Sequence, residues 1–112
     1  MKYLVNVYRS VAALPWDGSG GEPLPATAGH TGELLGEYRF ADPSLSAVVG
    51  VRNGVVSVTE GPYLPTRDQV AVQYLLDCDS HERAVGLAAL LSRARIGGVE
   101  VRPLMDAAGM EM

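Results

Sequence analysis

In residues 70–91, VAVQYLLDCDSHERAVGLAALL, a strand pattern is followed directly by a helix pattern, and this order determines the type of fold. Its first nine residues alternate, with Val70, Val72, Tyr74, Leu76 and Cys78 on one face and Ala71, Gln73, Leu75 and Asp77 on the other. Period two predicts a β-strand. Farther on, apolar residues recur at helical spacing as Ala84, Leu87, Ala88 and Leu91. This stripe predicts a helix with one buried face, capped by Asp79 or Ser80 and ended by Gly97-Gly98.

Segments near both ends of the chain also have strand patterns. Residues 3–8 alternate between Tyr3, Val5, Val7 and Leu4, Asn6, Tyr8, and this segment is interpreted as a strand and not as a signal peptide. Residues 99–102 predict the last strand, which Pro103 ends. Residues 33–40 stay ambiguous between a short helical turn and an extended segment.

Asn53-Gly54 lies between two valine-rich runs and is a strong hairpin signal. A two-residue turn pairs Arg52 with Val55, and it carries the register on to the next three pairs, Val51–Val56, Gly50–Ser57 and Val49–Val58. One hairpin face is then formed by Val49, Val51, Val56 and Val58. We expect this face to lie under the helix, with the apolar residues of the other strands.

The order strand, irregular segment, hairpin, strand, helix, strand is typical of an α+β domain with a mainly antiparallel sheet. Residues 15–32 are rich in Gly and Pro, which leaves no room for a long helix there. We interpret them as a mobile loop or, alternatively, as a lid. Trp16 within them is expected to cover some part of the protein. With 112 residues the chain fits one domain, residues 1–112.

Composition narrows the classes of function. The net charge of -4 repels phosphate backbones and anionic lipid, so we expect neither nucleic acid nor membrane as a partner. The single cysteine, Cys78, is interpreted as a small buried hydrophobe and not as a nucleophile. One cysteine cannot form a disulfide within the chain, which is consistent with a cytoplasmic protein. The sequence has no metal-ligand spacing, no phosphate-binding glycine loop and no nucleophile elbow. We therefore expect no metal and no cofactor.

Several motifs resemble the YCII-related (DGPF) family over residues 1–9 and about 42–106. They are Met1-Lys2-Tyr3 opening a strand, the Asn53-Gly54 hairpin, the turn Glu60-Gly61-Pro62-Tyr63 with residues 66–69, and the closing strand from Val99 to Met105. The family turn reads Asp-Gly-Pro-Phe, so Glu60 and Tyr63 are conservative departures. The resemblance implies a ferredoxin-like α+β fold, a homodimer of the α/β-barrel type and a cleft on the sheet. It also implies a first helix, for which residues 10–35 have too much Gly and Pro.

Some family members resemble lyases that use a histidine and an aspartate near the first helix, which here correspond to His30 and Asp42. Other members occur beside sigma factors, which implies a sensing role. From the alternation of the strands, the sheet face away from the helix takes Asn6, Tyr8, Arg52, Ser57, Thr59, Gln73, Leu75, Glu100 and Arg102. The candidate substrate-binding residues are Tyr8, Arg52, Gln73 and Arg102, because two guanidinium groups can clamp an anion.

The candidate catalytic residues are His30, Asp42 and Glu100, with His30 or Glu100 as the base and Asp42 orienting the histidine. The predicted function is a cofactor-free lyase, isomerase or cyclase that transfers a proton on an acidic or phenolic organic molecule. The alternative is a non-catalytic ligand-binding or protein-interaction module. A homodimer that pairs through the same sheet face, held by Glu–Arg pairs, is the competing interpretation of these charged residues.

Overall fold

The computed structural model describes residues 1–12, 16, 32–92 and 98–111. Most of the Gly/Pro-rich segment and the predicted Gly97 stop therefore lie outside the described residues. In chain order the elements are β1 (Lys2–Ser10), β2 (Leu34–Arg39), the 3-10 helix η1 (Pro43–Leu45), β3 (Ala47–Arg52), β4 (Val55–Glu60), β5 (Asp68–Asp77), α2 (His81–Ser92) and β6 (Val99–Pro103). Residues 33–40, which the sequence left ambiguous, are mainly extended and form β2.

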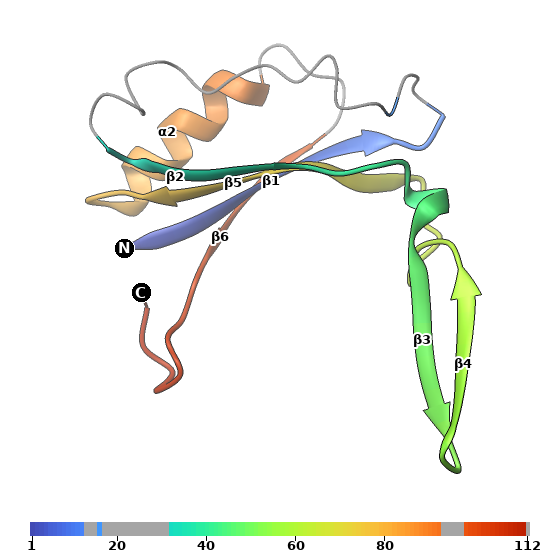
Figure 1. Cartoon of the computed structure of the whole chain (residues 1–112). Coiled ribbons are helices and arrows are strands. Elements are labelled where there is room, and N and C mark those ends of the chain that lie inside the picture. Colours follow the sequence, from blue (N-terminus) through green and yellow to red (C-terminus); the bar gives the residue numbers. More distant parts are fainter. Residues whose placement is uncertain (13–15, 17–31, 93–97, 112) are drawn as a thin grey trace.

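Four strands form the main sheet, in the order β2-β5-β1-β6, and every neighbouring pair is antiparallel. Strands β5 and β6 are therefore parallel to each other on either side of β1, and α2 connects them. Figure 1 shows α2 lying across one face of this sheet. The predicted α+β class with an antiparallel sheet is confirmed, and the strand order is consistent with a ferredoxin-like fold.

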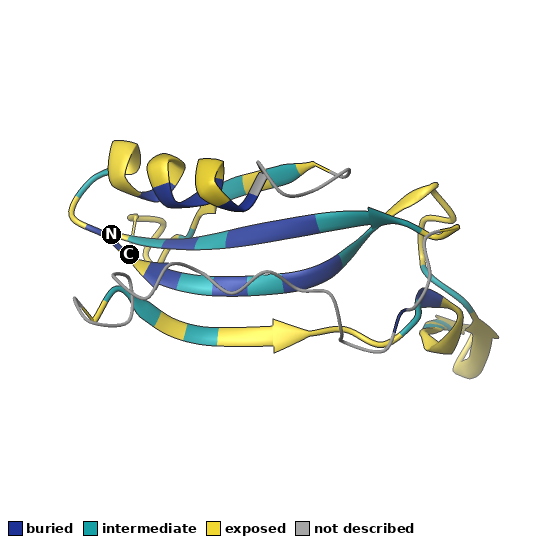
Figure 2. Cartoon of the chain, turned by 90° about the horizontal axis from the view of Figure 1, so that it is seen from above, coloured by how far each residue is buried: buried dark blue, intermediate teal, exposed yellow. Residues whose placement is uncertain are grey.

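The core lies between α2 and the sheet, as the patterns predicted. The apolar stripe Ala84, Leu87, Ala88 and Leu91 is buried, and it faces buried residues of β1 and β5, namely Tyr3, Val5, Val7, Val72, Tyr74 and Leu76. Val99 and Val101 of β6 pack against this cluster while partly exposed. In Figure 2 the buried positions run along β1, β5 and the inner side of α2. Ser80 is the cap, because its Oγ accepts a hydrogen bond from the Arg83 backbone N–H at 3.1 Å.

A bulge near the end of β1 changes which side chains reach the core. Val7 is opposite Val72, whereas Tyr8 is opposite Val70, so Ala71 is an extra residue on β5. Ala71 is buried among the core residues, although the simple alternation placed it on the other face.

Trp16 is buried and belongs to the same core cluster, so the prediction that it covers part of the protein is confirmed. The guanidinium of Arg9 lies 5.5 Å from the centre of its ring, in cation–π geometry. Within the described residues the indole Nε1 has no hydrogen-bond partner. The helix α2 has 12 residues, and in the described part of the chain no helix is long and apolar enough to cross a bilayer.

The hairpin has the predicted register but not the predicted place. Arg52 is opposite Val55 and Val49 is opposite Val58, as expected. However, β3 and β4 form a separate two-stranded sheet, which extends from the end of the main sheet toward the side opposite α2 (Figure 1). The prediction that Val49, Val51, Val56 and Val58 lie under the helix was therefore wrong. Arg52, Ser57 and Thr59 are likewise absent from the main sheet, because β2 and β5 pair with each other and leave the hairpin as an insertion between them.

Candidate functional site

The main sheet has one face without a helix, which we call the helix-free face. Asn6 at its centre is opposite Gln73 on β5 and opposite Glu100 on β6. One step along β1, Leu4 is opposite Leu75 and Arg102 in the same way. Side chains that are directly opposite or two residues apart share a face, so the helix-free face includes Leu4, Asn6, Tyr8, Tyr38, Val70, Gln73, Leu75, Glu100 and Arg102.

Asn6 is the unusual residue of this face, because its side chain is polar and only 6% exposed. Its Nδ2 donates a hydrogen bond to Oε1 of Glu100 at 2.9 Å. An ionised carboxylate can only accept, so the amide nitrogen must face Glu100 and the amide oxygen must point elsewhere. That oxygen, Oδ1, is buried without a partner among the described residues. An unsatisfied buried acceptor costs about 1–3 kcal/mol.

Tyr8 joins the same carboxylate from the next position along β1. Its hydroxyl donates to Oε1 of Glu100 at 3.5 Å, a long hydrogen bond. Burial raises the pKa of the Tyr8 phenol, and the negative charge of Glu100 raises it further. Tyr8 therefore stays a neutral donor at neutral pH, able to turn toward a bound ligand.

Arg102 supplies positive charge at the edge of the face. It is exposed, and it forms no ion pair with the residues that the structure describes. Its charge reaches the site, since it acts to lower the Tyr8 pKa against the larger effects of burial and Glu100. Arg102 lies on the same face as Glu100, two residues farther along β6.

The other predicted site residues that the structure describes, Arg52 and Asp42, do not lie on this face. Arg52 is exposed on the hairpin, so the predicted pair of arginines is not assembled on one sheet, and His30 lies outside the described residues. Asp42 follows β2 and caps η1, because its Oδ1 accepts from the Ser44 backbone N–H at 2.9 Å. Its carboxylate therefore has a local structural role.

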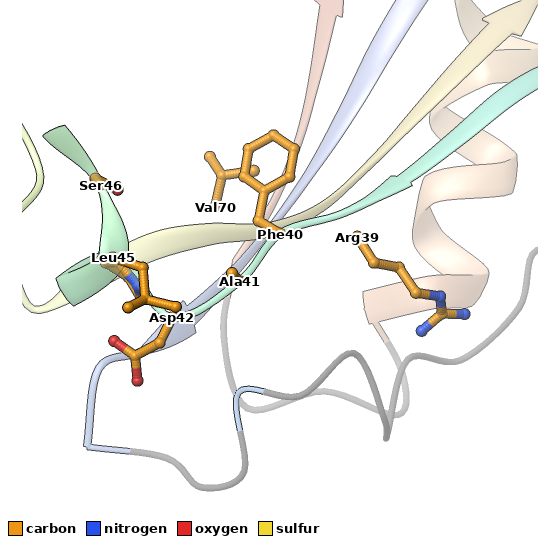
Figure 3. A pocket seen from close by; sticks show the side chains of 8 residues that line it. Arg39, Phe40, Ala41, Asp42, Leu45, Ser46 and Val70 are labelled. Carbon is orange, nitrogen blue, oxygen red and sulfur yellow. The ribbon is translucent and has the colours of Figure 1, made fainter.

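Asp42 also lines two shallow cavities at this end of the sheet, of about 410 and 480 Å³. Figure 3 shows the smaller one, in which Arg39 extends away from Asp42. Arg39 instead pairs with Glu37 at 2.7 Å. Val70, which is opposite Tyr8, lines this cavity, whereas Asn6, Glu100 and Arg102 do not.

Cys78 is 2% exposed, in agreement with its interpretation as a buried hydrophobe. Burial, with a smaller effect of Glu33, raises the pKa of its thiol to about 11, so the thiolate is scarce at neutral pH. Across the described ranges, His, Cys, Asp and Glu side chains do not gather in groups of three or more that could hold a metal ion.

Sequence reasoning placed Asn6 on this face but gave it no role. The available signal was its type, because asparagine is depleted in strand interiors and Asn6 stands between Val5 and Val7. What the sequence could not show is that Gln73 and Glu100 flank it on both sides.

No family model matches the chain. A curated relative, described as "Uncharacterized protein R00369" of Rhizobium meliloti (strain 1021), is 35% identical over 75 residues, which are 65% of this chain and 60% of that protein. The matched region is thus less than two thirds of the relative's length, and its description assigns no activity. Membership of the YCII-related family stays a prediction.

Proposed function

We propose that the helix-free face binds a small organic acid that also carries a hydroxyl or phenol group. The observation that carries this proposal is the buried Oδ1 of Asn6, which has no donor among the described residues. A ligand hydroxyl would supply that donor once the side chains that cover Oδ1 turn aside, and Arg102 would pair with the ligand carboxylate. An acceptor beside a free cation is complementary to a hydroxy acid or a phenolic acid.

We propose further that Glu100 acts as the base of a cofactor-free lyase, isomerase or cyclase. A proton passes from a carbon or hydroxyl of the bound acid to the Glu100 carboxylate, and the electron pair stays on the substrate as an enolate or phenolate facing Arg102. The proton then returns to another atom of the substrate or to a leaving group. His30, which the family resemblance suggests, is the competing candidate for the base.

A non-catalytic ligand-binding or protein-interaction module is the second candidate function. The observation that favours it is the position of Asp42, whose carboxylate caps η1 away from the helix-free face. Of the predicted catalytic residues that the structure describes, Glu100 alone lies on that face. Ligand binding without proton transfer would identify such a module.

We also propose that the chain acts as a homodimer whose two helix-free faces approach each other. This arrangement is what the family resemblance implies. It is supported by Leu4 and Leu75, apolar side chains that no helix covers and that remain half-buried on the face. A second copy would close the space above Asn6 and exclude water from it.

Replacing Arg102 with methionine is expected to weaken binding of hydroxy acids and phenolic acids roughly 10- to 100-fold, since a hydrogen bond to a charged group is lost. The melting temperature should change little, because Arg102 is exposed. Calorimetric titration measures the affinity, with Arg67→Met in an exposed turn as the matched control. If instead the melting temperature falls and the affinity is unchanged, Arg102 belongs to a Glu–Arg pair in a dimer interface.

A further inference from the structure

The hairpin β3–β4 has an apolar face that the protomer does not bury. Val49, Val51, Val56 and Val58, which we call the valine face, are 62–68% exposed. The opposite face mixes Val48 and Val55 with Arg52, Ser57 and Thr59, so the polar side chains of the two strands gather on that face and the valine face is entirely apolar. The sequence is thus patterned for burial of the valine face, although nothing among the described residues covers it.

The chain as a whole exposes more surface than a compact monomer. Its accessible surface is 7372 Å², whereas a folded monomer of this mass exposes about 6,000 Å². Its radius of gyration is 16.1 Å, against about 13 Å for a compact domain of this length. Two chains that each buried about 1,400 Å² would form an interface within the range of obligate dimers, in which the two partners together bury about 2,000–5,000 Å².

The direction of the hairpin shows where a partner fits. In Figure 1 it extends toward the helix-free side of the sheet, and in Figure 2, seen from above, it is foreshortened. The hairpin and the helix-free face thus form two sides of a corner. Each hairpin strand has six residues, a length of about 20 Å, and stacked sheets lie only about 10 Å apart. The hairpin is long enough to reach past the sheet of a second copy.

We propose that β3–β4 is a dimerisation arm, whose valine face packs against a second copy of this chain. The inference rests on the homodimer proposed above and adds the element that holds it together. A two-stranded hairpin is marginally stable alone in water, so the partner also keeps the arm folded.

Val51 and Val55 provide a matched pair of substitutions, because they are 68% and 67% exposed near the same turn but lie on opposite faces of the hairpin. Val51→Glu is expected to raise the dimer dissociation constant roughly 100-fold or more, since a carboxylate would have to be dehydrated in the interface. Val55→Glu should leave it nearly unchanged. Sedimentation velocity over the micromolar range measures both, and circular dichroism checks that the sheet and α2 persist.

Three results would overturn the arm. The first is that Val51→Glu has the same dimer dissociation constant as the wild type. The second is that Val55→Glu weakens the dimer as much as Val51→Glu does. The third is that the wild type is monomeric over the whole micromolar range. The last result would reject the homodimer too, and would leave the hairpin to a different protein, while ligand binding at Asn6 is tested separately. Should Val51→Glu fail to fold, Val58→Thr is nearly isosteric and is expected to weaken the dimer about tenfold. An unchanged dimer in Val58→Thr would also reject the arm.

Discussion

Replacing Glu100 with glutamine is expected to lower turnover ~10²–10⁴-fold, the usual contribution of a positioned proton-transfer group. The fold should persist, because the glutamine oxygen can still accept from Nδ2 of Asn6, now 2.9 Å from the carboxylate. The measurement is deuterium uptake from heavy water by hydroxy acids and phenolic acids, followed by proton NMR. This exchange reports proton abstraction before any product is known.

Two variants complete that experiment. Glu111→Gln, at an exposed position, should exchange deuterium as fast as the wild type. His30→Gln separates the two candidate bases, since a loss of exchange there with normal exchange in Glu100→Gln would assign the base to His30. A wild type that binds the acids without any exchange would contradict catalysis and favour the binding module.

Replacing Leu87 with alanine is expected to lower the free energy of unfolding by about 2–5 kcal/mol, because it opens a cavity between α2 and the sheet. Leu87 is 1% exposed, whereas Leu90 on the outer side of the same helix is 45% exposed. Leu90→Ala makes the same chemical change in the same helix and should cost less than about 1 kcal/mol. Urea unfolding at one fixed protein concentration compares them. Equal losses of unfolding free energy in the two variants would mean that the side of α2 carrying Leu87 is not the side that packs on the sheet.

The sequence predicted what depends on local chemistry. The apolar stripe of α2 is buried as expected, because residues at the 3.6-residue period of a helix, such as Leu87 and Leu91, lie on the same side of it. The hairpin register followed from Asn53-Gly54, and Asn53 has the positive φ of 52° that such a turn requires. The place of the hairpin did not follow, because a valine-rich face predicts burial without naming what buries it.

The sequence predicted which residues share the helix-free face, but it did not predict which of their side chains contact one another. Alternation placed Tyr8, Gln73, Glu100 and Arg102 together, and the strand pairing is consistent with that. The unpartnered oxygen of Asn6 depends on which residues neighbouring strands place beside it, and those pairings are long-range. The prediction for Asp42 came from the family resemblance, which could not reveal that its carboxylate caps η1.

NMR titration of the ¹⁵N-labelled protein tests directly whether a ligand binds around Asn6. Upon addition of hydroxy acids or phenolic acids, we expect the largest shifts at the side-chain amide of Asn6 and at the backbone amides of Gln73, Glu100 and Arg102. The Asn6→Leu variant, which removes the unpartnered oxygen, should lose these shifts while keeping its fold. Shifts concentrated around Asp42 and Phe40 instead, or shifts that persist unchanged in Asn6→Leu, would contradict ligand binding around Asn6.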